Sequence, residues 1–165
     1  MKLQISLKPI GYVRTERSDS EVSQSWPKGV PGRITLFPEY SAGLRGLEGF
    51  SHLIIVAWLH KVSEENRNVL KVRFRRFTRL GMRLEDLPEV GVFASDSPHR
   101  PNPIAISIVK VRKIDGDSVY VEGLDLYDGT PILDLRAYTP SYSIPGFTTP
   151  SWYQRLTEKL RSARG

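Results

Sequence analysis

Residues 95–103 read Ser-Asp-Ser-Pro-His-Arg-Pro-Asn-Pro, with three prolines within six residues. Each proline removes a backbone donor and fixes φ at about −65°, and each disfavours helical geometry at the residue before it. The segment is therefore neither a helix nor a central strand. Apolar runs flank it at residues 90–94 and 104–109, so we predict a rigid polar loop between two buried strands, a common way to present a site. The alternative is a stiff surface turn without chemistry.

The composition limits the kinds of site that the chain can carry. The absence of cysteine excludes disulfides, iron–sulfur clusters, thiolate zinc sites and a cysteine nucleophile. The histidines His52, His60 and His99 lack the spacing of a zinc protease, so we expect no metal. The net charge of +6 favours an anionic partner, with nucleic acid first. No long apolar run indicates a membrane span, so we expect a cytoplasmic protein without a membrane partner.

Short strand-like segments dominate the chain. Residues 53–59 are seven consecutive apolar residues, which predicts a strand buried on both faces. Residues 3–15 alternate and predict one or two strands interrupted at residues 9–11. Residues 16–31 are polar and rich in turn formers, so we expect a long loop there. Further short strands are expected at residues 33–36, 70–75, 104–111, 118–126 and 131–137.

Helical patterns are few. Residues 38–47 predict a turn with a short helix, and residues 151–164 predict a C-terminal helix with Trp152, Leu156 and Leu160 on one face. No long helix separates consecutive strands and no Gly-x-Gly-x-x-Gly or Walker motif is present, which argues against a parallel Rossmann sheet. We therefore expect a mainly β fold: one domain over residues 1–165, a closed or nearly closed, mostly antiparallel β-barrel with short helices and a C-terminal helix.

Residues 70–75 carry the densest group of positive charges. Strict alternation predicts that the apolar residues face the core and that Lys71, Arg73 and Arg75, here called the basic trio, line the opposite face of one strand. Such a line of cations is typical of a phosphate track for RNA. The alternative is an edge strand that its charges protect from aggregation.

Three motifs together resemble the TsaA/TrmO-like family. They are Gly-Val-Phe-Ala at residues 91–94, Ser-Pro-His-Arg-Pro-Asn-Pro-Ile at 97–104 and Asp-Gly-Thr-Pro-Ile-Leu-Asp at 128–134. The resemblance covers about residues 9–138. It implies a β-barrel methyltransferase that uses S-adenosyl-L-methionine and methylates N6 of threonylcarbamoyladenosine in the tRNA anticodon loop, and it implies a homodimer.

The resemblance also implies which residues contact the cofactor. They are Pro31, Gly32, Arg33, His60, Lys61, Asp96, Ile106, Asp128, Gly129, Thr130 and Pro131. The family usually has arginine at the position of Asp96. This departure keeps an alternative function open, a non-enzymatic RNA-binding β-barrel that has lost cofactor binding.

The implied chemistry assigns the catalytic candidates. Methyl transfer from a sulfonium is an in-line displacement that requires positioning and neither a metal nor a side-chain nucleophile. The acceptor nitrogen carries a proton, so a base is useful. Asp128 and His99 are the candidate bases, Asn102 would orient the nitrogen, and Arg100 could bind a carboxylate. The alternative for Asp128 is a turn residue that bonds only its own backbone.

Overall fold

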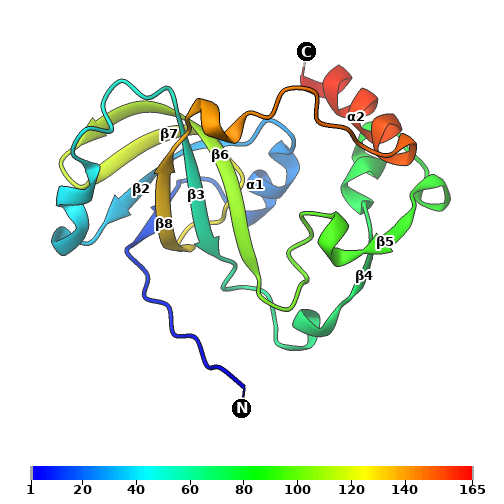
Figure 1. The fold of residues 1–165 in the computed structure, drawn as a ribbon, viewed down its shortest axis with the longest axis horizontal. Coiled ribbons are helices and arrows are strands. Elements are labelled where there is room, and N and C mark those ends of the chain that lie inside the picture. The colour runs from blue at the N-terminus through cyan, green and yellow to red at the C-terminus, as the bar shows by residue number, and fades with distance from the viewer. Residues whose placement is uncertain (1, 165) are drawn as a thin grey trace. The chain divides into compact units, whose positions relative to one another are not determined.

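Six strands form a closed antiparallel barrel (Figure 1). The computed structural model describes residues 2–164. The strand order around the barrel is β1-β2-β7-β6-β3-β8, and each pair of neighbours is antiparallel. The strands are β1 (Gly11–Arg14), β2 (Val30–Leu36), β3 (His52–Trp58), β6 (Ile104–Asp115), β7 (Ser118–Leu124) and β8 (Pro131–Ala137). The predicted antiparallel β-barrel is confirmed.

The chain divides into two compact units. The barrel unit comprises Met1–His60 and Ile104–Thr139, and the second unit comprises Lys61–Pro103 and Pro140–Gly165. The barrel unit also holds α1 (Asp19–Ser25) and the 3-10 helix η1 (Pro38–Leu44). That the two units act as one domain stays a prediction.

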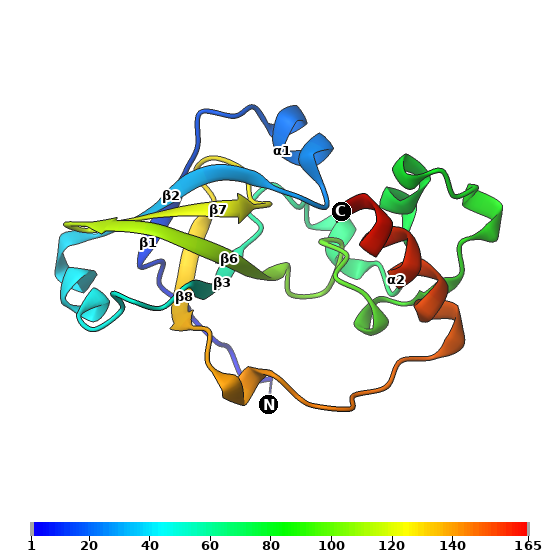
Figure 2. The same ribbon diagram turned by 90° about the horizontal axis from the view of Figure 1, so that it is seen from above.

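Alternation along the strands fills the barrel interior. On β3, Leu53, Ile55 and Ala57 are fully buried in the core, while the intervening Ile54 is also buried. Val56 and Trp58, on the same face as Ile54, are half-buried. The strand is therefore buried on its inner face and only partly covered on its outer face, where seven consecutive apolar residues predicted full burial. Figure 2 shows the barrel strands from above.

The second unit combines a small sheet with short helices. Its strands β4 (Lys71–Arg73) and β5 (Glu89–Gly91) pair with each other. Its helices are η2 (Glu65–Asn68), η3 (Arg75–Leu80), η4 (Leu84–Asp86), η5 (Val92–Ala94), η6 (Pro140–Tyr142) and α2 (Ser151–Arg164). None of the helices within residues 2–164 is long and apolar enough to cross a membrane.

The C-terminal helix α2 packs on η3 within the second unit. The ring of Phe74 lies 5.8 Å from that of Trp152 and 6.3 Å from that of Tyr153, measured between ring centroids. Leu156, one turn after Trp152, is 1% exposed. The predicted helix and its apolar face are confirmed.

The prediction of a loop over residues 16–31 was wrong, because α1 lies inside it. Ser18 caps this helix: its hydroxyl accepts a hydrogen bond from Glu21 N (3.2 Å), and the Glu21 carboxylate accepts one from Ser18 N (2.8 Å). The hydrogen bond from the Ser18 backbone is the main cause that lowers the pKa of Glu21. Ser-x-x-Glu at residues 18–21 is the sequence signature of this capping box, so the pattern could have revealed the helix.

Two predicted strands also differ in extent. Residues 2–8 form no strand, and β1 begins only at Gly11. β4 ends at Arg73 because Phe74 has ψ of 57° and leads into η3. The alternation predicted that Arg75 continues the strand that carries Lys71 and Arg73. This prediction was wrong, because Arg75 starts a 3-10 helix.

Candidate functional site

The strand registers bring one end of each strand together at a single end of the barrel, here called the site end. Arg14 at the end of β1 pairs with Arg33 near the start of β2. Tyr12 pairs with Pro131 at the start of β8. β3 is the other neighbour of β8. It ends at Trp58, which pairs with Ile104 at the start of β6. The predicted cofactor segments at residues 31–33, at residues 128–131 and at His60 therefore follow or precede strand ends that lie at the site end.

Thr15 joins two of these segments directly. Its backbone N donates to Asp128 Oδ1 at 3.0 Å, and its Oγ1 donates to the Pro31 carbonyl oxygen at 3.0 Å. Sequence reasoning missed Thr15, which looks like one more polar residue at the start of a loop. Its role depends on a contact with a residue 113 positions away, and no local pattern signals such a contact.

Asp128 is exposed and partly engaged. Its Oδ1 accepts the Thr15 hydrogen bond, whereas Oδ2 accepts none from residues 2–164. The alternative that Asp128 bonds only its own turn is therefore wrong. The neighbouring Thr130 instead holds the turn, because its buried hydroxyl donates to the Tyr127 carbonyl oxygen at 2.7 Å. Gly129 has φ of +75°, a backbone conformation that residues with a side chain rarely adopt.

The site end holds a second carboxylate that sequence reasoning missed. Val30 pairs with Leu124 at the end of β7, so the next residue, Asp125, lies at this end. Its Oδ1 accepts a hydrogen bond of 2.6 Å from the buried hydroxyl of Ser107 on β6. The sequence signal was available, since two aspartates stand three positions apart before Gly129.

Two further predicted cofactor residues differ in the space around them. A Cβ on Gly32 would lie 2.6 Å from Leu124 Cδ2 and 3.0 Å from the Arg14 carbonyl oxygen, so only glycine fits without a shift. Ile106 lies on the outer face of β6 and is 72% exposed, whereas the next residue, Ser107, points inward. Arg33 and Pro31 are exposed.

The proline-rich loop of residues 95–103 belongs to the second unit. Arg100 Nη1 donates to the carbonyl oxygens of Ser95 (2.9 Å) and Ser97 (3.4 Å). The Ser97 hydroxyl accepts a hydrogen bond from His99 N at 3.3 Å. The guanidinium thus fixes the loop that the prolines stiffen. An arginine has five N–H donors, so these bonds leave others for a ligand.

The remaining loop candidates are accessible. Asp96, His99 and Asn102 are exposed, and so is Lys61 at the start of the second unit. These four residues and Arg100 lie in one unit, and Asp128 with its partners lies in the other. The catalytic roles given to His99, Arg100, Asn102 and Asp128 stay predictions.

The basic trio lies in the second unit on two elements. Lys71 and Arg73 alternate with Val72 on β4, and Arg75 begins η3. All three basic residues are exposed. Arg73 Nη1 also donates to the Leu87 carbonyl oxygen at 2.9 Å, so part of this side chain holds the local fold.

Comparisons with known proteins support one family. Residues 16–143 match the family model described as the tRNA-methyltransferase O N-terminal domain. A Methanothermobacter thermautotrophicus protein named "Probable S-adenosyl-L-methionine-binding protein" is 35% identical over 150 residues, which cover 88% of this chain and 98% of that protein. A rat protein named tRNA (adenine(37)-N6)-methyltransferase is 35% identical over 163 residues, which cover 94% of this chain and 35% of that protein.

A solved structure has the same fold. The crystal structure of TrmO from Pseudomonas aeruginosa superposes with a TM-score of 0.63 at 26% identity, covering 90% of this chain and 62% of that chain. The present chain thus spans less than two thirds of that protein and about a third of the rat protein. The family model covers most of residues 1–165, and the TsaA/TrmO-like motifs lie within it. The chain belongs to the family of the tRNA-methyltransferase O N-terminal domain.

Proposed function

We propose that the protein transfers a methyl group from S-adenosyl-L-methionine to N6 of an adenosine in the tRNA anticodon loop, with threonylcarbamoyladenosine as the acceptor. The family and the names of the rat and archaeal relatives support this reaction. The observation that carries the proposal is the junction at Thr15. It links Pro31 and Asp128, which belong to the two barrel segments that the family resemblance assigns to the cofactor.

The donor set at the site end fits this cofactor. S-adenosyl-L-methionine has a carboxylate, an ammonium group and ribose hydroxyls, which need a cation and anions or carbonyl groups as partners. Arg33 supplies an exposed guanidinium, and Asp125 and Asp128 supply carboxylates. We assign Arg33 to the cofactor carboxylate and Asp125 to a hydroxyl or the ammonium group.

We assign the role of the base to Asp128, and its hydrogen bond with Thr15 supports this assignment. The cofactor supplies an electrophilic methyl group on a sulfonium, and the acceptor nitrogen must lose its proton during the transfer. Thr15 N holds Asp128 Oδ1, which fixes the carboxylate and leaves Oδ2 to accept that proton. A positioned base contributes typically about 10²–10⁴-fold in rate. His99 and Asn102 would orient the acceptor, and the basic trio would contact tRNA phosphates.

The proposal extends to the partners and the compartment. tRNA is the substrate, the family resemblance implies a homodimer, and a tRNA substrate is consistent with a cytoplasmic location. The loop residue Asp96 replaces a family arginine with the opposite charge, so any contact that it makes to the cofactor would favour the ammonium end over the carboxylate.

Mass spectrometry of tRNA nucleosides tests the reaction. The protein is incubated with labelled S-adenosyl-L-methionine and with tRNA that contains threonylcarbamoyladenosine, and the label should appear in the N6-methylated nucleoside. tRNA that lacks the threonylcarbamoyl group is the matched control substrate. Label in neither tRNA would refute the reaction, and equal label in both would refute the proposed acceptor.

Calorimetry separates the proposal from its alternative. Binding of S-adenosyl-L-methionine should weaken in Arg33→Ala and stay unchanged in Arg112→Ala, which removes an arginine that is also exposed but lies on β6 and pairs with Glu122. If wild-type protein binds tRNA but not the cofactor at millimolar concentration, the non-enzymatic RNA-binding barrel is the correct function.

A further inference from the structure

The barrel closes along a short seam between β1 and β8. Only Gly11 and Tyr12 of β1 pair with β8, opposite Ile132 and Pro131. One further bond, from Ile10 N to the Ile132 carbonyl oxygen at 2.7 Å, precedes them. β8 continues to Ala137 and pairs with β3 along that length. Within residues 2–164, no strand pairs with the opposite edge of β8 beyond Ile132, here called the seam edge.

The seam edge presents backbone groups that a strand could bond. Tyr138 N donates to the His52 carbonyl oxygen at 3.1 Å, and opposed residues in an antiparallel pair alternate between bonded and non-bonded pairs. Leu135 and Ala137 occupy the non-bonded positions opposite Ile55 and Leu53, so their peptide groups point toward the seam. Leu135 N donates only to the carboxylate of the preceding Asp134, at 3.0 Å.

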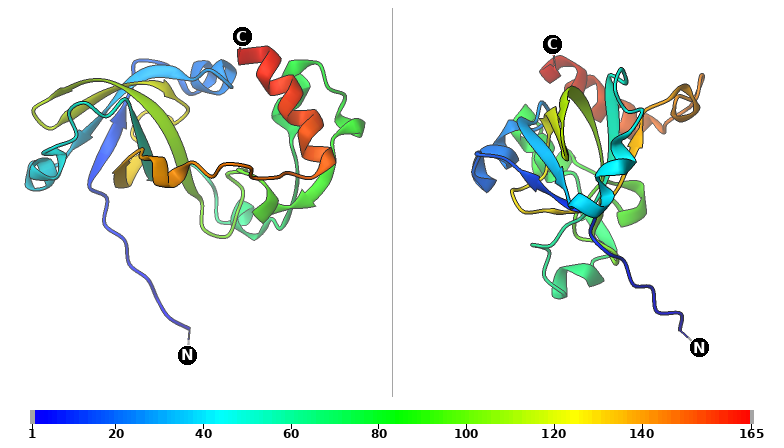
Figure 3. Two further views of the ribbon diagram at one scale, coloured as in Figure 1. Left: turned by 45° about the horizontal axis from the view of Figure 1, so that its top comes forward. Right: turned by 90° about the vertical axis from the view of Figure 1, so that its left-hand side faces the viewer.

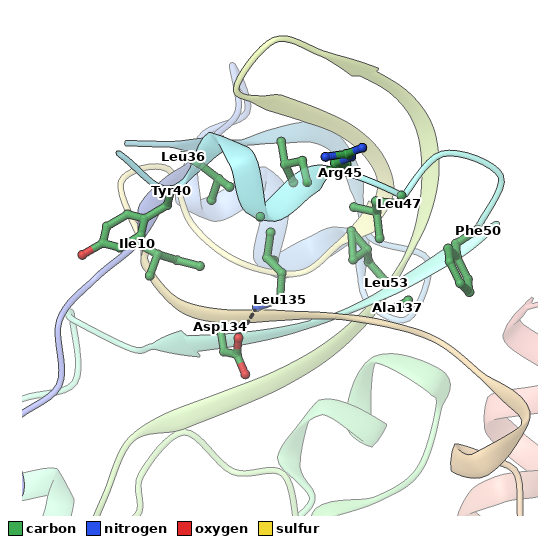
Figure 4. A pocket seen from close by; sticks show the side chains of 13 residues that line it. Ile10, Leu36, Tyr40, Arg45, Leu47, Phe50, Leu53, Asp134, Leu135 and Ala137 are labelled. Carbon is green, nitrogen blue, oxygen red and sulfur yellow. Dashed lines mark hydrogen bonds between the residues drawn. The ribbon is translucent and has the colours of Figure 1, made fainter. Parts of the chain in front are cut away.

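A pocket with apolar and polar lining residues lies along the same edge. Its volume is about 410 Å³. Figure 4 shows Leu135 pointing into the pocket, while Asp134 points to the other side of the strand. The lining includes apolar residues and also polar ones: Ile10, Leu36, Leu44, Leu53 and Ala137, with Tyr40, Arg45 and Asp134. A segment on the seam edge could therefore form strand bonds with β8 and bury apolar side chains in the pocket.

The N-terminal segment of residues 2–8 has the properties that this edge requires. Leu3, Ile5 and Leu7 alternate with polar residues, so an extended backbone places them on one face. They are 81%, 73% and 55% exposed. Within the described chain no hydrogen bond joins residues 2–8 to another residue. Seven extended residues span about 23 Å, longer than the about 16 Å of a five-residue edge.

The segment leads away from its own seam. Ile10 donates its N–H to Ile132 on β8 and accepts at its carbonyl from Phe37 N at 2.9 Å. In a regular strand both groups of one residue point to the same side, so the backbone turns out of the β1 ladder at Ile10. Figure 3 shows the run before β1 extending away from the barrel.

We propose that residues 2–8 of one copy add a strand to the seam edge of a second copy, with Leu3, Ile5 and Leu7 in its pocket. Every chain carries both the segment and the edge, so the exchange is reciprocal and closes a two-fold dimer. Strand addition of this kind takes affinity from main-chain bonds and specificity from alternate side chains. The inference rests on the homodimer in the proposed function and gives it a specific interface, but it does not depend on methyl transfer.

Light scattering after size exclusion tests the dimer. Wild-type protein should have twice the 18.7 kDa mass of one chain. The variant Leu3→Ser/Ile5→Ser/Leu7→Ser should have the mass of one chain and keep the far-UV circular dichroism of the folded barrel, because more than half of each of these side chains is exposed on its own chain. The matched control is Gln4→Ala/Ser6→Ala, which changes the opposite face and should stay a dimer. A monomeric wild type, or a dimeric triple variant, would overturn the proposal.

Cysteine pairs test which chain supplies the segment. The protein has no cysteine, so Ile5→Cys protein mixed with Leu135→Cys or Ala137→Cys protein should form an oxidised covalent dimer in at least one mixture. Each variant alone should form no covalent dimer under the same oxidising conditions. Absence of a covalent dimer in both mixtures would overturn the proposal. The double variant Ile5→Cys/Leu135→Cys would also overturn the proposal if it formed a crosslink only within one chain, since this would place the segment on its own barrel.

Discussion

Asp128→Asn separates the structural part of the proposed role of Asp128 from the chemical part. An asparagine keeps an oxygen at Oδ1 that can accept the 3.0 Å hydrogen bond from Thr15 N. It replaces Oδ2 with a nitrogen that carries two hydrogens and cannot take a proton from the acceptor. Asp128→Ala removes both functions.

The two variants should therefore differ in stability and agree in activity. A hydrogen bond of this kind contributes about 1 kcal/mol net, so Asp128→Ala should melt about 2–4 °C lower, the shift expected per kcal/mol in a chain of this size. Asp128→Asn should melt close to wild type. Loss of the base should slow methyl transfer by about 10²–10⁴-fold in both variants.

Single-turnover methyl transfer at saturating cofactor and tRNA measures the chemical step, and thermal unfolding measures stability. Asp117→Asn is the control, since that carboxylate lies in the hairpin after β6, at the barrel end opposite the site end, and bonds only Ser118. Transfer by Asp128→Asn at more than a tenth of the wild-type rate would refute the role of the carboxylate as a base. Equal destabilisation of the Asn and Ala variants would refute the structural role of its Oδ1.

Gly29→Ala should lower the free energy of unfolding by at least about 2 kcal/mol, because its φ is +74° and a Cβ would lie 2.4 Å from the carbonyl carbon of Gly123. Gly43→Ala, where a Cβ meets open space, is the control, and equal urea midpoints for the two would contradict the close approach. Leu156→Ala should cost about 2–5 kcal/mol, as is typical for a buried leucine, and an unchanged urea midpoint would show that α2 does not pack on η3. Changing the basic trio to alanine should reduce the salt dependence of tRNA binding by up to about three phosphate contacts; an unaltered slope would mean that these cations are only solvated.

The sequence predicted the barrel well because its strands carry their own signals. The seven apolar residues 53–59 overlap β3, and the short, β-branched segments after Pro103, which turn residues separate, form β6, β7 and β8. The same local reasoning failed at residues 2–8. Their alternation is that of a strand, but a strand requires a partner, and the described chain does not supply one to this segment.

The candidate site was predicted in part, and the resemblance to a family did most of that work. The family resemblance assigned the segments at residues 31–33 and 128–131 to the cofactor, yet neither Thr15 nor Asp125 stood out. Their roles come from partners that are distant in sequence: Asp128 for Thr15 and Ser107 for Asp125. Spacing along the chain does not report such contacts.

The sequence by itself determined the fold class, the family and the stiffness of the loop at residues 95–103, because periodicity, motifs and proline geometry are local properties. Only the tertiary structure decided that Arg100 holds that loop together through two carbonyl oxygens, and that the antiparallel register of β1, β2 and β8 brings Pro31 and Asp128 to one residue, Thr15. The physical reason is that register sets which distant residues become neighbours, and register follows from the packing of the whole barrel.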